Sequence, residues 1–474
     1  MKKGNIVRSL QLINNCLIMV SYNNKRKGNT TTQLILLAIL VLMFSACSIT
    51  KKINRQADAI LLKDSVISSG HIGISIYEPA TDKYWYNLNA TKYFTPASNT
   101  KLFSLYAGLK YLGDSLVAAR YWAHENKLFI LPSGDPTFLH PDFNKQPLLE
   151  LMKATGDTIL ISLKNDVKPY GQGWAWDDFD QSYVAERSMF PVFGNQLWLN
   201  HKAGLTKKLP GNRLTDTMHL IASQSLYIQP AYFAKDILYQ KDALYARKQN
   251  ENKFFVDSVF GEKNIPFICF NGVTQLQILS DIINKSFKKV VSDLKPHEAY
   301  KVLKSQPTDS MLKPMMHNSD NFFAEQTLLM ASNEQLGYMN DEAIIDTLLK
   351  KDFKDIPQKP NWVDGSGLSR YNLFTPQSFI YLLNKMKNEF GLDRLKTILP
   401  TGGTGTFKNY YINDSSFIYA KTGSLSGCIA LSGYLITRKN KLLIFSVLTN
   451  NFKGRATAVR RAVEKFIIGI RMDY

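Results

Sequence analysis

The chain has 474 residues, of which 45% are hydrophobic and 12% aromatic, and its formal net charge at pH 7 is +19. This much apolar material excludes a globally disordered protein, and the length suits about three domains of roughly 150 residues, or two with one split by an insertion. The basic charge favours anionic partners such as envelope polymers or lipid headgroups, although a solvated lysine-rich surface explains it equally well.

Residues 1–46 are typical of a targeting leader. Three basic residues at 25–27 precede an unbroken apolar run at 34–44, and small residues then stand before Cys47. The run is too short to cross about 30 Å of hydrocarbon comfortably, so we expect a signal peptide and not a permanent transmembrane helix. Small residues before a cysteine resemble a bacterial lipobox, which implies a lipid on Cys47; plain cleavage or an uncleaved anchor stays open. A secretion signal argues against nucleic acid as the anionic partner.

Four cysteines occur, at Cys16, Cys47, Cys269 and Cys428. The last two could form a disulfide, which the sequence leaves open. No cysteine pair has metal-ligand spacing, the histidines are scattered, and no His-Glu-x-x-His motif occurs. We therefore predict no metal site and no cofactor.

A β-hairpin and a helix follow the leader. Residues 72–77 and 83–88 are rich in strand-forming side chains on either side of a turn. Between 101 and 112 the apolar residues recur at helical spacing. The chain therefore enters its first helix directly from a hairpin.

Ser98 and Lys101 lie three positions apart where this helix is predicted to begin. This spacing puts both side chains on one helix face, one turn apart. A desolvated lysine can take the proton of such a serine, and a helix N-terminus directs N–H groups toward developing negative charge. The same spacing recurs at Ser48, Ser286 and Ser310, but only the Ser98 copy follows a hairpin and opens an apolar helix.

The stretch 141–295 differs in character from its surroundings. It holds short β-like runs, such as 158–163 and 196–200, between aromatic and glycine-rich segments. We expect it to form one or two mostly β inserted subdomains, which split one domain into the parts 52–140 and 296–474.

The elements after the insertion are two helices, three strands and a closing amphipathic helix, predicted at 311–317 and 321–330, at 417–421, 430–437 and 441–449, and at 456–470. The order of elements predicts an α+β fold. In it, the N- and C-terminal strands meet across the insertion in one antiparallel sheet, and helices pack on that sheet.

Two further motifs carry possible chemistry. Ser319 and Asn321 lie two apart on a predicted loop, where Ser319 could relay a proton and Asn321 could bind a peptide carbonyl. An Asp or Asn before an apolar helix is more often only a cap.

The second motif is Lys421-Thr422-Gly423, at the end of a predicted strand. Lys421 provides a fixed cation for a carboxylate, Thr422 adds a hydroxyl contact, and Gly423 lets a substrate backbone approach closely. The N–H of Ser424 would pair with that of Ser98 as an oxyanion hole.

In this order the three motifs resemble those of penicillin-binding proteins and serine β-lactamases. The chain resembles most the low-molecular-mass class C penicillin-binding proteins, which are D-alanyl-D-alanine carboxypeptidases and endopeptidases. The segments that carry this resemblance are 93–101, 134–136, 319–325, 364–370, 405–406 and 421–423.

The resemblance implies a serine β-lactamase-like transpeptidase domain whose substrate is peptidoglycan. It implies that Ser98 forms an acyl-enzyme, that β-lactams acylate the same serine, and that the protein works in the periplasm without a cofactor.

The resemblance also extends into the insertion. The segment 173–178 is similar to one that leads to a substrate contact, so Asp178 and Tyr183 would meet the amino end of the stem diamino acid. The family often has Phe where this chain has Tyr183, and a packed aromatic corner explains the segment equally well. We interpret the loop 364–367 as a structural glycine turn.

Two other functions compete with this interpretation. A serine β-lactamase would share the acylation machinery, but the chain lacks the Glu-x-x-Leu-Asn segment that positions a deacylating water, and its insertion is too long. A non-catalytic wall-binding protein would not need every reactive group, yet all of them are present.

Overall fold

The structure is a computed structural model that describes residues 49–474 apart from 157, 164–166, 202–216, 222–223, 258–261, 270–271 and 292–299. The predicted leader and Cys47 lie outside the described residues. Asp58–Tyr474 forms one compact unit. In the part of the chain that the structure describes, no helix has the length and apolar character needed to cross a membrane.

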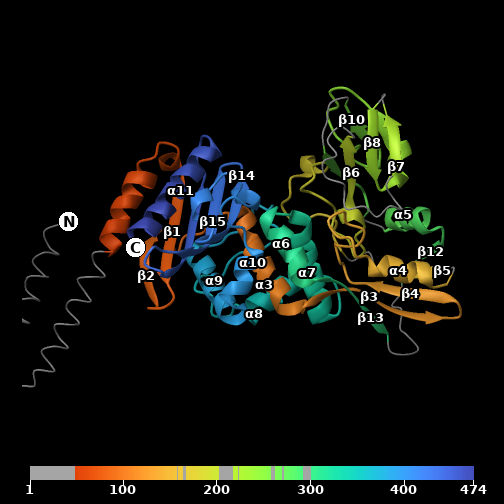
Figure 1. Cartoon of the computed structure of the whole chain (residues 1–474), viewed down its shortest axis with the longest axis horizontal. Coiled ribbons are helices and arrows are strands. Elements are labelled where there is room, and N and C mark those ends of the chain that lie inside the picture. The colour runs from red at the N-terminus through yellow and green to blue at the C-terminus, as the bar shows by residue number, and fades with distance from the viewer. Residues whose placement is uncertain are drawn as a thin grey trace, which may run out of the picture. The chain divides into compact units, whose positions relative to one another are not determined.

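A five-stranded sheet joins the beginning of this unit to its end (Figure 1). Its strands, in spatial order, are β14 (Ile418–Leu425), β15 (Cys428–Ile436), β16 (Leu442–Asn450), β1 (His71–Glu78) and β2 (Lys83–Leu88). All four pairings are antiparallel, and β1 pairs with β16 so that His71 lies opposite Asn450. The predicted meeting of N- and C-terminal strands is confirmed.

Helices cover both faces of this sheet (Figure 1). On one face lies α9 (Pro376–Phe390), where the Tyr434 hydroxyl donates to the Leu383 carbonyl at 2.7 Å. On the other face lies α11 (Ala456–Asp473), whose Val463 shares a pocket with Leu431 of β15. Successive residues of a strand point to opposite faces, and β15 is buried along nearly its whole length for that reason.

A second group of helices packs beyond α9. They are α3 (Lys101–Tyr111), α6 (Thr308–His317), α7 (Asn321–Leu336), α8 (Asp341–Lys350) and α10 (Leu392–Ile398). The first nine residues of α3 are all buried, because α6, α7 and α9 surround it. A helix enclosed in this way holds the side chains at its N-terminus in fixed positions.

The region between α3 and α6 contains three further sheets. One has the order β12–β5–β4–β3–β13, one has the order β11–β6–β8–β7, and β9 pairs with β10. The strands are β3 (Ser115–His124), β4 (Lys127–Pro132), β5 (Thr158–Ser162), β6 (Gln196–His201), β7 (Thr217–Ile221), β8 (Gln224–Gln229), β9 (Ile237–Tyr239), β10 (Phe254–Val256), β11 (Lys263–Pro266), β12 (Ser286–Val290) and β13 (Lys301–Pro307). Among the described residues of this region, the α-helices are α4 (Pro147–Ala154) and α5 (Val273–Ile283).

The strands β3, β4 and β13 lie outside the limits 141–295 that the sequence suggested for the insertion. They nevertheless hydrogen-bond into the same sheet as β5 and β12. We therefore propose that the inserted region extends from Ser115 to Pro307.

Two features of the sequence take a definite form in the structure. Cys269 and Cys428 are both free and buried, so they form no disulfide with each other.

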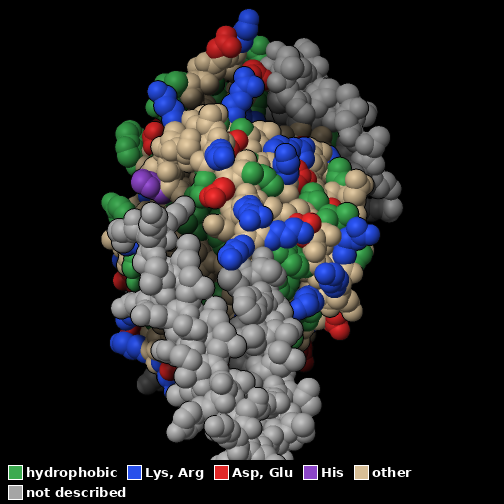
Figure 2. Space-filling view, turned by 90° about the vertical axis from the view of Figure 1, so that its left-hand side faces the viewer, with side chains coloured by type: hydrophobic (Ala, Val, Ile, Leu, Met, Phe, Trp, Pro, Cys, Tyr) green, Lys and Arg blue, Asp and Glu red, His purple; other side chains and the backbone are tan. Residues whose placement is uncertain are grey.

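Figure 2 shows Lys and Arg side chains distributed over one face of the molecule among acidic and apolar side chains. On this face the distribution favours a solvated basic surface over a single dense patch.

Candidate active site

The three motifs meet where α3, α7 and β14 approach one another. Ser98 lies in a single 3₁₀ turn, η3 (Ala97–Thr100), directly ahead of α3. Two residues of this site have left-handed backbones that glycine adopts most easily, Ala97 with φ of 47° and Ser319 with φ of 58°. Such conformations cost about 1–2 kcal/mol each and are concentrated at functional sites.

Lys101 is the first residue of α3 and its side chain is fully buried. Its Nζ donates to Ser98 Oγ at 3.1 Å, to Asn321 Oδ1 at 2.6 Å and to the Ser366 carbonyl at 2.8 Å. An ammonium group has three donors, and these three acceptors satisfy them all. The structure thus brings Ser98, Lys101 and Asn321 together.

Burial also makes Lys101 a usable base. Desolvation lowers the pKa of Lys101 to about 8, although the charges of Asp364, Asp320 and Glu325 act in the opposite direction. Near pH 7, roughly one molecule in ten then carries the neutral amine, which has a lone pair for the Ser98 proton.

The second lysine holds the other serine of the site. Lys421 is fully buried, and its Nζ donates to Ser319 Oγ at 2.8 Å and to the Thr422 carbonyl at 2.7 Å. Desolvation, followed by the nearby charge of Lys101, lowers the pKa of Lys421 well below its usual value. In the described part of the chain, Ser319 Oγ is hydrogen-bonded to Lys421, whereas the three partners of Lys101 are Ser98, Asn321 and Ser366.

β14 presents its backbone to the site along its outer edge. The Ala420 N–H donates outward to the Pro400 carbonyl at 3.1 Å. Alternate residues of an antiparallel strand direct N–H and C=O to the same side, so the N–H groups of Thr422 and Ser424 point outward too. The Ser424 N–H therefore lies on this outer edge, one residue after Gly423, where the face of β14 packs against the turn that carries Ser98.

Gly423 lets β14 lie close to the turn that carries Ser98, which the sequence did not indicate. We expected the glycine to admit a substrate backbone at the end of a strand. In the structure it lies inside β14, and a Cβ there would come within 2.6 Å of the Pro96 carbonyl and 3.0 Å of the Ser98 nitrogen. The missing side chain therefore lets β14 pack against the protein's own turn around Ser98.

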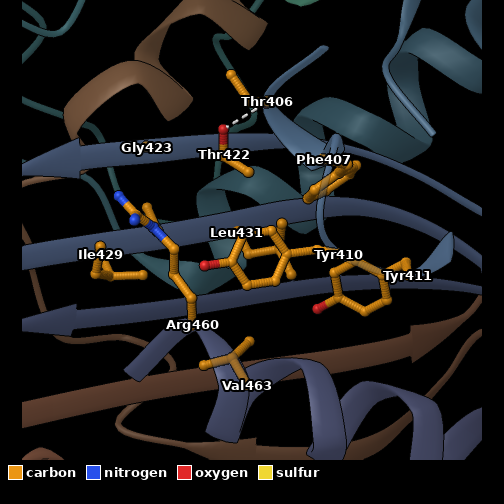
Figure 3. Close-up of a pocket in the computed structure, with 11 residues that line it drawn as sticks. Thr406, Phe407, Tyr410, Tyr411, Thr422, Gly423, Ile429, Leu431, Arg460 and Val463 are labelled. Carbon is orange, nitrogen blue, oxygen red and sulfur yellow. Dashed lines mark hydrogen bonds between the residues drawn. The ribbon is translucent and has the colours of Figure 1, made fainter. Parts of the chain in front are cut away.

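Thr422 has a neighbour from the segment 405–406 that carries the resemblance, and Ser424 has one that sequence reasoning missed. Thr422 Oγ1 donates to Thr406 Oγ1 at 2.8 Å, and Arg460 of α11 donates to Ser424 Oγ at 2.8 Å. Figure 3 shows both threonines and the Arg460 side chain around a small pocket of about 30 Å³ beside β14. The Arg460 guanidinium and Lys421 Nζ give this end of the strand N–H donors that suit a carboxylate.

Asp178 and Tyr183 lie near the second motif. Burial, followed by the charge of Asp178 and a hydrogen bond to it, raises the pKa of Tyr183 to about 12. The Tyr183 carbonyl accepts from Asn321 Nδ2 at 3.0 Å, and Tyr183 lines a pocket of about 190 Å³ with Ser319 and Asn321. Asp178 ends a 3₁₀ turn, η4 (Trp176–Asp178), and reaches this pocket through Tyr183.

The loop 364–367 is both a structural turn and part of the site. Gly367 has φ of 80°, and a Cβ there would overlap the Ala97 carbonyl, which fits the predicted turn. The Ser366 carbonyl also receives a hydrogen bond from Lys101, a role that sequence reasoning missed. Backbone carbonyls have no sequence signature, so only the match of this segment to the family pattern could have indicated it.

Across the described residues, there is no group of three or more His, Cys, Asp or Glu side chains that could hold a metal ion.

Known proteins share both the sequence pattern and the fold. A family model described as the D-Ala-D-Ala carboxypeptidase 3 (S13) family matches residues 53–470. The chain is 22% identical over 410 residues to D-alanyl-D-alanine carboxypeptidase DacB of Haemophilus influenzae, and the aligned region covers 77% of this chain and 82% of that protein. It is 23% identical over 465 residues to a D-alanyl-D-alanine carboxypeptidase of Actinomadura sp. strain R39, with 87% and 84% covered.

The crystal structure of penicillin binding protein 4 from Haemophilus influenzae superposes with a TM-score of 0.66 at 18% identity, covering 88% of this chain and 98% of that one. This likeness confirms the predicted fold class.

Proposed function

The chain belongs to the S13 family of D-Ala-D-Ala carboxypeptidases, and from that premise we propose that Ser98 is the nucleophile of a serine peptidase acting on the stem peptides of peptidoglycan. One observation carries the proposal: a fully buried lysine, Lys101, has its Nζ 3.1 Å from Ser98 Oγ and a pKa lowered to about 8. A nucleophile and a base within hydrogen-bond reach are the requirement for covalent catalysis by serine.

Acylation begins when the substrate carboxylate binds Lys421 and Thr422. Neutral Lys101 takes the proton of Ser98, and Ser98 Oγ attacks the carbonyl carbon of the penultimate D-Ala. The N–H groups of Ser98 and Ser424 stabilise the oxyanion, a kind of contact worth about 3–4 kcal/mol per donor in other serine peptidases. Asn321 positions the acyl chain.

The acyl-enzyme then forms and is hydrolysed. The C–N bond breaks, and the proton taken by Lys101 passes to the amine of the departing D-Ala. Ser319 is the proposed relay, and for this its Oγ must turn from Lys421, which it contacts in the structure, toward Lys101. Water next gives a proton to Lys101 and attacks the ester, and Ser98 leaves with that proton restored. The step needs no cofactor, and a β-lactam enters the same acylation step in place of the peptide.

Release of D-alanine tests the proposal. The protein, incubated with a stem peptide ending in D-Ala-D-Ala, is expected to liberate D-Ala, measured with a D-amino-acid oxidase assay. An equimolar amount of benzylpenicillin should stop it. Rapid penicillin consumption without D-Ala release would support a β-lactamase instead, and the absence of both reactions would support a wall-binding protein.

Asp178 and Tyr183 are proposed to select the substrate. Tyr183 lines the pocket beside Asn321, and the Asp178 carboxylate suits the cationic amine at the end of a stem diamino acid. We expect Asp178→Asn to lower kcat/KM roughly tenfold for a peptide with a free side-chain amine and to leave an acetylated peptide unaffected.

Asp177→Asn is the matched control, because Asp177 is the exposed neighbour in the same turn. Equal losses on both peptides would show that Asp178 only supports the local structure.

The substrate places the protein in the bacterial cell envelope. We propose in addition a periplasmic location and a lipid anchor at Cys47, supported by the basic, apolar and small-residue segments of the leader. Labelling with a fatty acid, lost in Cys47→Ala and retained in Cys16→Ala, is the corresponding check.

A further inference from the structure

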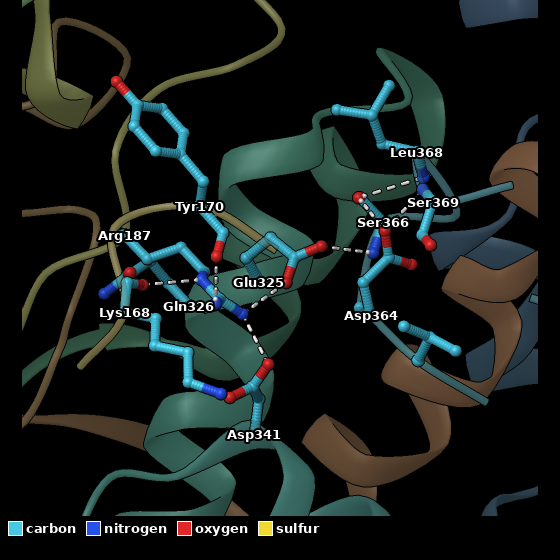
Figure 4. Close-up of polar contacts among 12 residues, drawn as sticks. Lys168, Tyr170, Arg187, Glu325, Gln326, Asp341, Asp364, Ser366, Leu368 and Ser369 are labelled. Carbon is cyan, nitrogen blue, oxygen red and sulfur yellow. Dashed lines mark hydrogen bonds and ion pairs between the residues drawn. The ribbon is translucent and has the colours of Figure 1, made fainter. Parts of the chain in front are cut away.

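A buried carboxylate, that of Glu325, lies behind the site and contacts neither Ser98 nor Ser319. Glu325 is on α7, four residues after Asn321, and is fully buried. Its Oε1 accepts from the Ser366 N–H at 2.7 Å, and its Oε2 lies 3.4 Å from Arg187 Nη1. Figure 4 shows Glu325 between these two partners. A charge in such surroundings is costly unless both of its oxygens are engaged.

The first partner of Glu325, Ser366, also contacts Lys101, the proposed general base. The N–H of Ser366 is held by Glu325, while the carbonyl of the same residue accepts from Lys101 Nζ at 2.8 Å. Asp364 fixes the rest of this loop by accepting from the N–H groups of Gly367 at 2.8 Å and Ser369 at 2.7 Å. The orientation of the carbonyl that holds Lys101 therefore depends on Glu325.

The second partner of Glu325, Arg187, belongs to the inserted region and binds other residues of it. Its guanidinium is buried, pairs with Asp341 at the start of α8, and donates to the carbonyls of Lys168 at 3.1 Å and Tyr170 at 2.9 Å. The segment 168–187 contains the proposed substrate contacts. Arg187 therefore fastens the base of that segment to α7.

We propose that Glu325 is a positioning residue that joins the general base to the substrate-selecting segment 168–187, holding the Ser366 carbonyl against Lys101 on one side and Arg187 on the other. The proposal rests on the proposed function, because it assigns to Lys101 the role of base. One further contact supports the link: Trp174 Nε1, from the same segment, donates to Asp364 Oδ2 at 2.9 Å.

The charge of Glu325 also acts on Lys101. The groups that face Glu325 are Arg187 from the insertion, Asp341 of α8, Asp364 of the loop and Lys101 of α3. Desolvation, followed by the charge of Asp364, raises the pKa of Glu325 to about 7, whereas Arg187 lowers it, so Glu325 is ionised near pH 8, where Lys101 titrates. The negative charge of Glu325 in turn raises the pKa of Lys101. Removing that charge should lower the Lys101 pKa and make the free base available at lower pH.

Glu325→Gln separates these effects from simple packing. Glutamine keeps the size and an oxygen for the Ser366 N–H but carries no charge. With acylation by a fluorescent penicillin as the readout, we expect the acid limb of the rate against pH to move to lower pH by about half a unit or more. A purely structural role would change the rate or the melting temperature without moving the midpoint.

The matched control is Glu334→Gln, the same change on the same helix, where the carboxylate pairs with Arg120 at 2.7 Å outside the network. It should keep the wild-type midpoint. An unchanged midpoint in Glu325→Gln, or an equal shift in the control, would overturn the proposal. Failure of the wild-type protein to acylate would instead remove the proposed function.

Glu325→Asp keeps the charge and shortens the reach. We expect it to retain the wild-type midpoint and to lower the plateau rate at least fivefold, because the carboxylate no longer spans Ser366 and Arg187. This variant decides the matter if the glutamine variant does not fold, since a wild-type plateau in folded Glu325→Asp would contradict the positioning role.

Discussion

Ser98→Ala protein is expected to gain no mass on incubation with benzylpenicillin, whereas the wild-type protein gains the mass of one penicillin. The variant lacks the oxygen that opens the ring, and the Lys101 amine that faces it has no proton to take. Loss of the nucleophile should lower D-Ala release by a factor on the order of 10⁴ or more. Intact-protein mass spectrometry measures the first effect, and the D-Ala assay measures the second.

Ser310→Ala is the control for this experiment. Ser310 also stands three residues before a lysine, Lys313, but it is an exposed residue of α6. Its variant should acquire the adduct normally. An adduct that persists in Ser98→Ala would identify a different nucleophile, with Ser319 the first to test. Penicillin consumed by the wild-type protein without any adduct would indicate fast deacylation and a β-lactamase.

Lys101→Met should slow acylation by roughly 10²–10⁴-fold while leaving the protein folded. Methionine fills a similar volume without the amine, and general base catalysis contributes roughly 10²–10⁴-fold to such reactions. Because the fold lowers the pKa of Lys101 from 10.5 to about 8, the buried ammonium destabilises the native state at neutral pH. We therefore expect no large fall in melting temperature, even though Asn321 Oδ1 and the Ser366 carbonyl lose a donor.

The pH dependence gives a second measure of the same residue. The wild-type acylation rate should rise about tenfold per pH unit below about 8 and level off above, as Lys101 loses its proton. This slope should disappear in Lys101→Met. Lys110→Met, on the exposed side of the same helix, should keep both the rate and the slope. A wild-type slope in Lys101→Met would assign the titration to another group.

The fold and the central residues could be predicted because their signals are local. Ser98 and Lys101 are separated by one helical turn, and a strand alternates in polarity over six or seven residues. The limits of the insertion could not be found in this way. β3 and β13 pair with each other although Arg120 and its partner Val302 are 182 residues apart, and nothing in the sequence near either strand indicates its partner.

The electrostatics of the site were hidden for a related reason. Glu325 and Arg187 are 138 positions apart, and a charged residue in an apolar helix is usually exposed. Only the structure shows that Glu325 is buried and contacts Arg187 and Ser366. It also shows that burial lowers the pKa of Lys101. Gly423 is a similar case, because the sequence does not show that a side chain at this position would clash with the turn around Ser98.

The outer edge of β14 has a consequence for the behaviour of the protein in a crowded envelope. Exposed strand edges invite chains to add on as extra strands, which promotes aggregation. Here Pro400 and Thr401 cap the edge at Tyr419 and Ala420, and within the described residues no backbone partner takes up the outward N–H groups of Thr422 and Ser424. Two open positions are enough for the last residues of an extended stem peptide and too few for another protein's strand. The capping segment thus makes the edge a template that short peptides can use and that misfolded neighbours cannot.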